Sequence, residues 1–140
     1  MRRLVGLLII LILTGCGTVS DPIHTSIGRW EELNSQLETR RIILSSDFVY
    51  SIEDENSIQC WAYDAGALII FPLGGNPSDA KNQRWAMTWE GPNQVILASD
   101  NERVTLQRIS DRGELTQRGD ELLAKARREF KTMFVCPQQF

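Results

Sequence analysis

The regular spacing of turn sequences through the middle of the chain constrains the fold most. Residues typical of turns recur at 53–56, 64–66, 74–79, 91–93 and 100–102, and the segments between them are short and rich in β-branched and aromatic residues. Turn signals about nine to twelve residues apart are typical of strands that pair antiparallel with their neighbours in the chain. The spacing therefore predicts an antiparallel meander.

Hydrophobic alternation supports these strands. From residue 42 the pattern is that of a half-buried strand over 42–52, with the polar Ser45, Asp47 and Ser51 on odd positions. The apolar residues on even positions are Ile42, Leu44, Phe48, Tyr50 and Ile52. The segment 67–73 is almost wholly apolar, which predicts a central strand covered on both faces. The segments 57–63, 84–90, 94–99 and 103–109 complete a predicted meander of about five strands.

Two helices are expected to flank this sheet. Ser26 can cap a first helix over 26–41, in which Ile27, Trp30 and Leu37 recur at helical spacing. Thr116 can cap a second helix that ends before Pro137. The apolar stripe of this second helix consists of Leu122, Leu123, Ala126, Phe130 and Met133 or Phe134. A helix at each end packed on a meander predicts an α+β domain.

The N-terminus has the features of a secretory leader. Arg2 and Arg3 precede an apolar run over 4–13, and this run is too short to span a bilayer, which needs about 20 residues. The run closes with Leu13-Thr14-Gly15-Cys16, which resembles the lipobox of bacterial lipoproteins. The resemblance implies removal of residues 1–15, diacylglycerol on the Cys16 thiol and acylation, typically with palmitate, of its new amine. Such chains anchor a protein stably.

The same resemblance predicts where the protein resides. In lipoproteins of the enterobacterial type an Asp after the lipidated Cys retains the protein in the inner membrane, and here that residue is Gly17. We therefore expect a protein anchored in the outer membrane and facing the periplasm. Residues 16–25 are then the lipidated N-terminus and a tether, and residues 26–140 form one α+β domain, a size that can bury a core.

Cys60 and Cys136 remain after lipidation of Cys16. In an oxidising compartment an even pair of cysteines predicts a disulfide, here closing a loop of about 77 residues. The alternative, a reactive thiol, needs a nearby base or a Cys-x-x-Cys pair, and the sequence shows neither. We expect the bridge to hold the C-terminal tail to the sheet.

Charge and composition disfavour three classes of function. Without Arg2 and Arg3 the chain has 13 Lys and Arg against 18 Asp and Glu, a formal charge of −5 that disfavours binding to nucleic acid. The single histidine, His24, lies in the predicted tether, so no His-based catalytic site is expected. One histidine and two paired cysteines cannot supply a first shell for zinc or copper. The sequence thus predicts no catalytic residue, no metal and no cofactor, although acidic side chains near residues 47–55 leave glycan chemistry as an alternative.

Aromatic residues are the best candidates for binding. Trp85 and Trp89 share one face of a predicted strand, and Trp61 and Tyr63 share one face of another. These rings either fill the core or form an exposed platform on which a partner stacks, because Trp and Tyr dominate binding hot spots. The sequence leaves both alternatives open.

Taken together, these features predict a non-enzymatic binding protein. In leader, size and cysteines the chain is similar in general outline to periplasmic immunity and inhibitor lipoproteins, which implies that it blocks a toxin or an envelope hydrolase. Two alternatives are an accessory subunit of an envelope secretion or conjugation complex and a lipoprotein that binds glycan or peptidoglycan. Under the first two readings the expected partner is a periplasmic protein.

Overall fold

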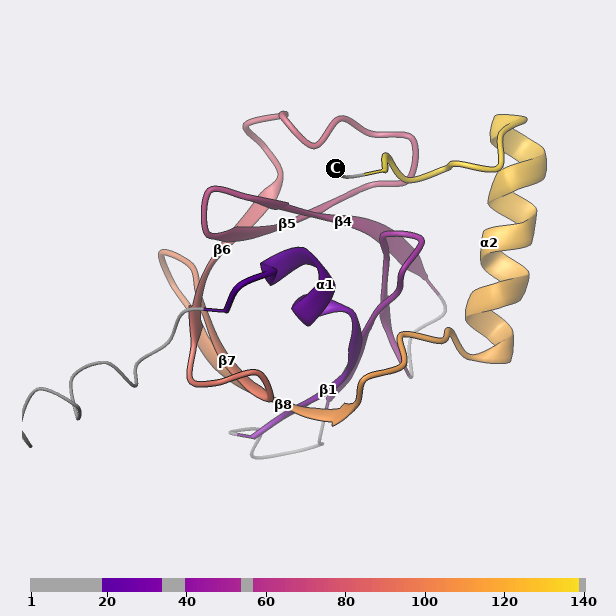
Figure 1. Cartoon of the computed structure of the whole chain (residues 1–140). Coiled ribbons are helices and arrows are strands. Elements are labelled where there is room, and N and C mark those ends of the chain that lie inside the picture. The colour runs from indigo at the N-terminus through magenta and orange to yellow at the C-terminus, as the bar shows by residue number, and fades with distance from the viewer. Residues whose placement is uncertain (1–18, 34–39, 54–56, 139–140) are drawn as a thin grey trace, which may run out of the picture.

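The computed structural model describes residues 19–33, 40–53 and 57–138, which form a closed barrel of antiparallel strands with two helices (Figure 1). Each strand pairs with its neighbours in the chain, and the last pairs with the first. The strands are β1 (Gly28–Glu32), β2 (Arg41–Leu44), β3 (Val49–Ile52), β4 (Ile58–Asp64), β5 (Ala67–Phe71), β6 (Gln83–Trp89), β7 (Gln94–Ala98) and β8 (Arg103–Ser110). The helices are α1 (Pro22–Ser26) and α2 (Gln117–Phe130).

The prediction of an α+β domain with an open five-stranded meander was therefore wrong. The largest error is the helix expected over 26–41, because residues 28–32 form β1 and Arg41 begins β2. Residues 34–39, also within that predicted helix, lie outside the described residues. β1 pairs with β8 through partners such as Trp30 and Arg108. This pairing closes the barrel and leaves no free edge among the described strands, which is the physical advantage of a barrel over an open meander.

The second error is the single strand expected over 42–52. It is two strands, β2 and β3, joined by a tight turn in which the Phe48 amide donates to the Ser45 carbonyl (3.1 Å) and Phe48 adopts a left-handed φ of 63°. Leu44 pairs with Tyr50 and Ile42 with Ile52, so an odd number of residues separates paired positions and the even-numbered side chains share one face on both sides of the turn. Uninterrupted alternation in the sequence therefore did not reveal the reversal of the chain.

The two ends of the barrel differ. Short turns join β2 to β3, β4 to β5 and β6 to β7 at one end, here called the closed end. At the opposite, open end β5 connects to β6 through residues 72–82 and β7 connects to β8 through residues 99–102, and there β1 and β3 end and β2 and β4 begin. Helix α1 lies across the closed end, as the view in Figure 1 shows. It occupies residues that were expected to belong to a tether.

Helix α2 lies outside the barrel, where it contacts β4 and buries Leu123 and Ala126 (Figure 1). Its predicted N-cap is confirmed, since the Thr116 hydroxyl accepts from the Gly119 amide at 3.1 Å. The helix ends at Phe130, earlier than expected, because Lys131 takes the left-handed conformation that terminates helices. No helix among residues 19–33, 40–53 and 57–138 is both long and apolar enough to cross a membrane.

Candidate functional site: the barrel cavity

The open half of the barrel contains a cavity of about 260 Å³. Side chains along a barrel strand point alternately inward and outward, and the inward ones of the open half line this space. The volume exceeds the roughly 150 Å³ of an apolar cavity that holds benzene. The space is thus sufficient for one small organic molecule.

The walls of the cavity are mostly apolar. They are formed by Ile42, Leu44, Tyr50, Ile52, Leu68, Ile70, Trp85, Leu97, Val104 and Leu106. Paired residues on neighbouring strands place these side chains next to one another, as with Leu68 and Trp85 on β5 and β6 and with Val104 and Leu97 on β8 and β7. A concave apolar surface of this kind favours ligands that gain from leaving water.

Polar side chains line the cavity where the strands reach the open end. Glu32 ends β1, Arg40 precedes β2, Gln83 begins β6, and Glu102 precedes β8, with Gln59 near the start of β4. Arg40 and Glu32 form a weak ion pair, with Nε and Oε2 at 4.0 Å. We call these five residues the polar rim. They offer both hydrogen-bond donors and acceptors to the polar end of a ligand.

Aromatic rings fill the closed half of the barrel. The rings of Trp30 and Trp89 meet edge to face with centroids 5.9 Å apart, and Trp30 donates its indole N–H to the Ser26 carbonyl at 2.9 Å. The Trp61 ring, fully buried, contacts Phe48 with centroids 5.0 Å apart and donates to the Ser45 carbonyl at 3.1 Å. The remaining space is therefore confined to the open half of the barrel.

Arg108 stabilises the closed end through hydrogen bonds and a cation–π contact. Its guanidinium lies over the Trp30 ring, 4.3 Å from the centroid, and donates to the carbonyls of Thr25, Ile27 (2.8 Å) and Pro92 (2.8 Å). Burial lowers the pKa of Arg108 from the usual arginine value, and the charge of nearby Asp111 partly offsets this effect. The contacts tie α1 to the turn between β6 and β7, so the closed end is held by a structural cation.

The structure places the predicted aromatic residues mainly inside the barrel. Trp61 and Trp89 are buried (0% and 5% exposed), Trp85 lines the cavity, and Tyr63 is half-buried. The predicted sharing of faces by Trp85 with Trp89 and by Trp61 with Tyr63 agrees with their places on β6 and β4, and the shared face is the inner one. The sequence left open whether these rings fill the core or form an exposed platform. Trp61 and Trp89 lie in the core.

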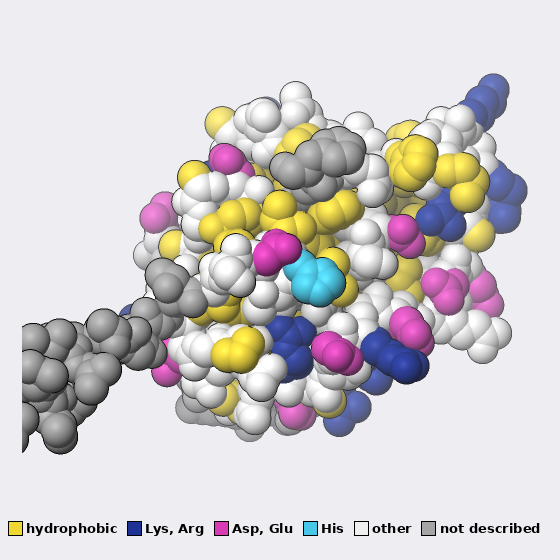
Figure 2. All heavy atoms as spheres, viewed as in Figure 1, with side chains coloured by type: hydrophobic (Ala, Val, Ile, Leu, Met, Phe, Trp, Pro, Cys, Tyr) yellow, Lys and Arg dark blue, Asp and Glu magenta, His cyan; other side chains and the backbone are white. Residues whose placement is uncertain are grey.

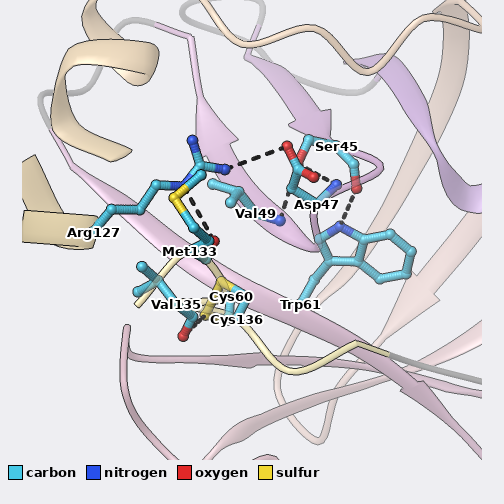
Figure 3. Close-up of a disulfide and its surroundings, with 9 residues drawn as sticks. All are labelled: Ser45, Asp47, Val49, Cys60, Trp61, Arg127, Met133, Val135 and Cys136. Carbon is cyan, nitrogen blue, oxygen red and sulfur yellow. Dashed lines mark hydrogen bonds and ion pairs between the residues drawn. A yellow bond between two sulfur atoms is a disulfide. The ribbon is translucent and has the colours of Figure 1, made fainter. Parts of the chain in front are cut away.

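The predicted disulfide between Cys60 and Cys136 is confirmed (Figure 3). It joins the outer face of β4 to the segment after α2, and both cysteines are buried. Beside it, Arg127 pairs with Asp47 at 3.8 Å and donates to the Met133 carbonyl at 3.2 Å (Figure 3). The bridge thus holds the C-terminal segment against the barrel. Cys16 and the leader lie outside the described residues.

The cavity walls and the polar rim were not predicted from the sequence. The alternation of β7 and β8 contained the signal for Leu97, Val104 and Leu106, but in an open sheet the same residues would simply pack under a helix. Only closure of the sheet into a barrel makes this face enclose a cavity. Across residues 19–33, 40–53 and 57–138, no cluster of three or more His, Cys, Asp or Glu is arranged to hold a metal ion.

Comparison of the chain with protein-family models, with curated proteins and with solved structures finds no match in any of the three. The architecture alone therefore defines its class, a closed up-and-down β-barrel of eight strands.

Proposed function

We propose that the protein binds one small, predominantly apolar molecule inside its barrel and catalyses no reaction. The observation that carries this proposal is the cavity of about 260 Å³ with apolar walls and a polar rim. Barrels of eight strands, such as those of lipocalins and streptavidin, are wide enough to hold one small ligand. Because one fold serves many functions, the cavity rather than the architecture supports the proposal.

The chemistry of the lining indicates the kind of ligand. The apolar walls suit a hydrocarbon or aromatic body, and the polar rim suits one hydrogen-bonding group at its end. Glu32 and Glu102 outweigh Arg40 in charge, which disfavours a bare anion at the rim. We therefore propose a neutral or cationic amphiphile of small size.

A titration with the fluorescent probe N-phenyl-naphthylamine tests this proposal. The probe should brighten on binding to the wild-type protein, and Val104→Phe should abolish binding because the larger ring occupies the cavity. Filling a cavity commonly raises stability by about 0.5–2 kcal/mol, so the melting temperature of this variant should not fall.

Thr105→Phe is the matched control. Thr105 neighbours Val104 on β8 and points to the opposite face of the sheet, so this variant should bind the probe as the wild type does. Equal binding by both variants would contradict a site inside the barrel.

We also propose that the protein acts as an outer-membrane lipoprotein anchored through Cys16 and exposed to the periplasm. The lipobox sequence supports this proposal. Labelling of cells with radioactive palmitate should mark the wild-type chain, and Cys16→Ala should lose the label and the membrane attachment. A labelled Cys16→Ala protein would contradict anchoring at this residue.

The blocking or immunity role, the role in an envelope complex and glycan binding stay predictions. Each of them requires an outer surface, whereas Trp61 and Trp89 lie inside the barrel and Trp85 lines its cavity.

A further inference from the structure

The largest exposed apolar side chains of the described residues gather where α2 ends. Phe130, Met133 and Phe134 are 48%, 66% and 67% exposed, and they lie within five residues of one another in the chain. Figure 2 shows hydrophobic side chains over this end of α2, next to dark blue basic ones. We call Phe130, Met133 and Phe134, with the neighbouring cations Lys125, Arg127, Arg128 and Lys131, the α2-end patch. Exposed apolar groups that cluster in this way mark interaction surfaces.

The patch is held in a fixed shape. Phe130 packs against Gly74, where an added Cβ would collide with its ring. The Phe134 amide donates to the Thr132 hydroxyl at 3.1 Å, and the next two residues, Val135 and Cys136, are buried and joined to β4 by the disulfide. A surface ordered in advance loses little conformational entropy when it binds.

The charge of the patch opposes that of the rest of the chain. Lys125 pairs with Glu129 and Arg127 pairs with Asp47, both at 3.8 Å, whereas Arg128 and Lys131 have no ion-pair partner among the described residues. The patch is thus locally cationic in a chain whose formal charge is −3. Aromatic and apolar side chains with cations around them form the pattern of protein surfaces that lie in the headgroup region of an anionic bilayer.

The position of the patch agrees with this occupant. The view of Figures 1 and 2 faces the closed end, with α1 in front, and the apolar end of α2 is visible from the same side. The described chain also begins at this side, since residue 19 leads directly into α1. Arg127 of the patch pairs with Asp47 of the closed-end turn at 3.8 Å, so this part of the patch lies beside the closed end.

We propose that the α2-end patch rests on the surface of an anionic phospholipid bilayer, with Phe130, Met133 and Phe134 at the level of the headgroups and Arg128 and Lys131 beside lipid phosphates. The inference is independent of ligand binding in the cavity, because none of the patch residues lines that cavity.

Fluorescence quenching by brominated lipid tests the proposal. The full chain carrying Phe134→Trp is reconstituted in vesicles of phosphatidylcholine with brominated acyl chains, with or without phosphatidylglycerol. Three of the native tryptophans are at most 5% exposed, so the new ring reports on the patch. Its fluorescence should be quenched in vesicles that contain phosphatidylglycerol and much less in those that lack it.

Ile109→Trp is the matched control, because Ile109 is an exposed apolar residue (45%) on β8, outside the patch. Adding Arg128→Gln and Lys131→Gln to F134W should weaken the contact with the anionic surface about 30-fold, since each cation near such a surface contributes a factor of about five. High salt should have the same effect.

Two outcomes would overturn the proposal. One is equal quenching of F134W and I109W by brominated lipid. The other is a mixed result, in which brominated lipid in vesicles does not quench F134W but the ring is protected from aqueous iodide in isolated envelopes. That result would assign the patch to a protein partner. Failure of the probe titration on the cavity leaves both readouts unchanged, so the two proposals are tested separately.

Discussion

Arg108 should be the most important single residue at the closed end of the barrel. Helix α1 has only five residues, far too few to be stable alone, so it depends on contacts from outside. Arg108 supplies hydrogen bonds to the partly buried carbonyls of Thr25 and Ile27 and lies over the Trp30 ring. Its further bonds to Pro92 and Asn93 are exposed and contribute less.

The size of the effect follows from these contacts. We consider Arg108→Met, which keeps an apolar stem over Trp30 and removes every donor. Two charge-assisted hydrogen bonds at about 1.5 kcal/mol each and a cation–π contact of about 1 kcal/mol amount to about 4 kcal/mol. Relief of the desolvation that lowers the pKa of Arg108 offsets part of this loss. We therefore expect the free energy of unfolding to fall by about 2–4 kcal/mol, a large share of the stability of a small domain.

Urea unfolding and amide hydrogen exchange measure this prediction. In R108M the amides of Thr25 and Ile27, which bond within the α1 segment, should exchange faster even where the barrel stays folded. Arg103→Met, at an exposed site on the same strand, should change stability by less than about 0.5 kcal/mol. Equal stability of R108M and R103M, with unchanged exchange at α1, would refute the reasoning.

Two further predictions concern stability elsewhere. Replacing Cys60 and Cys136 together by Ala should lower the free energy of unfolding by about 4 kcal/mol, because the disulfide closes a separation of 76 residues, and the loss should match that of the reduced wild type in the same urea titration. Gly113→Ala should lower the free energy of unfolding by about 1–3 kcal/mol, because the new Cβ would collide with backbone atoms of Leu44 and Ser45. The control is Glu114→Ala at the neighbouring exposed residue, which should be nearly neutral in thermal melts. An unchanged midpoint for the double cysteine variant, or for G113A, would contradict the respective account.

Much of the strand pattern was predictable from local sequence. The turns at 64–66 and 91–93 lie between strands as expected, and the apolar run of β5 is buried at every residue. Thr116 caps α2 because its hydroxyl satisfies a free amide of the first turn, a requirement that any helix start imposes. Cysteine number and the expected compartment were sufficient to predict the Cys60–Cys136 bridge. These features depend on a few neighbouring residues or on chemistry that does not need the fold.

The closure of the barrel, and with it the candidate site, was decided only by the tertiary structure. The spacing of Trp30 from Ile27 predicted a helix, but Trp30 lies in β1. The strand is stabilised by pairing with β2 and with β8, which is about 75 residues away in the chain. The same closure placed Trp61 and Trp89 inside, made a cavity from the faces of Leu97 and Val104, and left Phe130, Met133 and Phe134 outside. Alternation along a strand separates two faces, but whether a face encloses a space depends on the pairing of strands far apart in sequence, which no local pattern records.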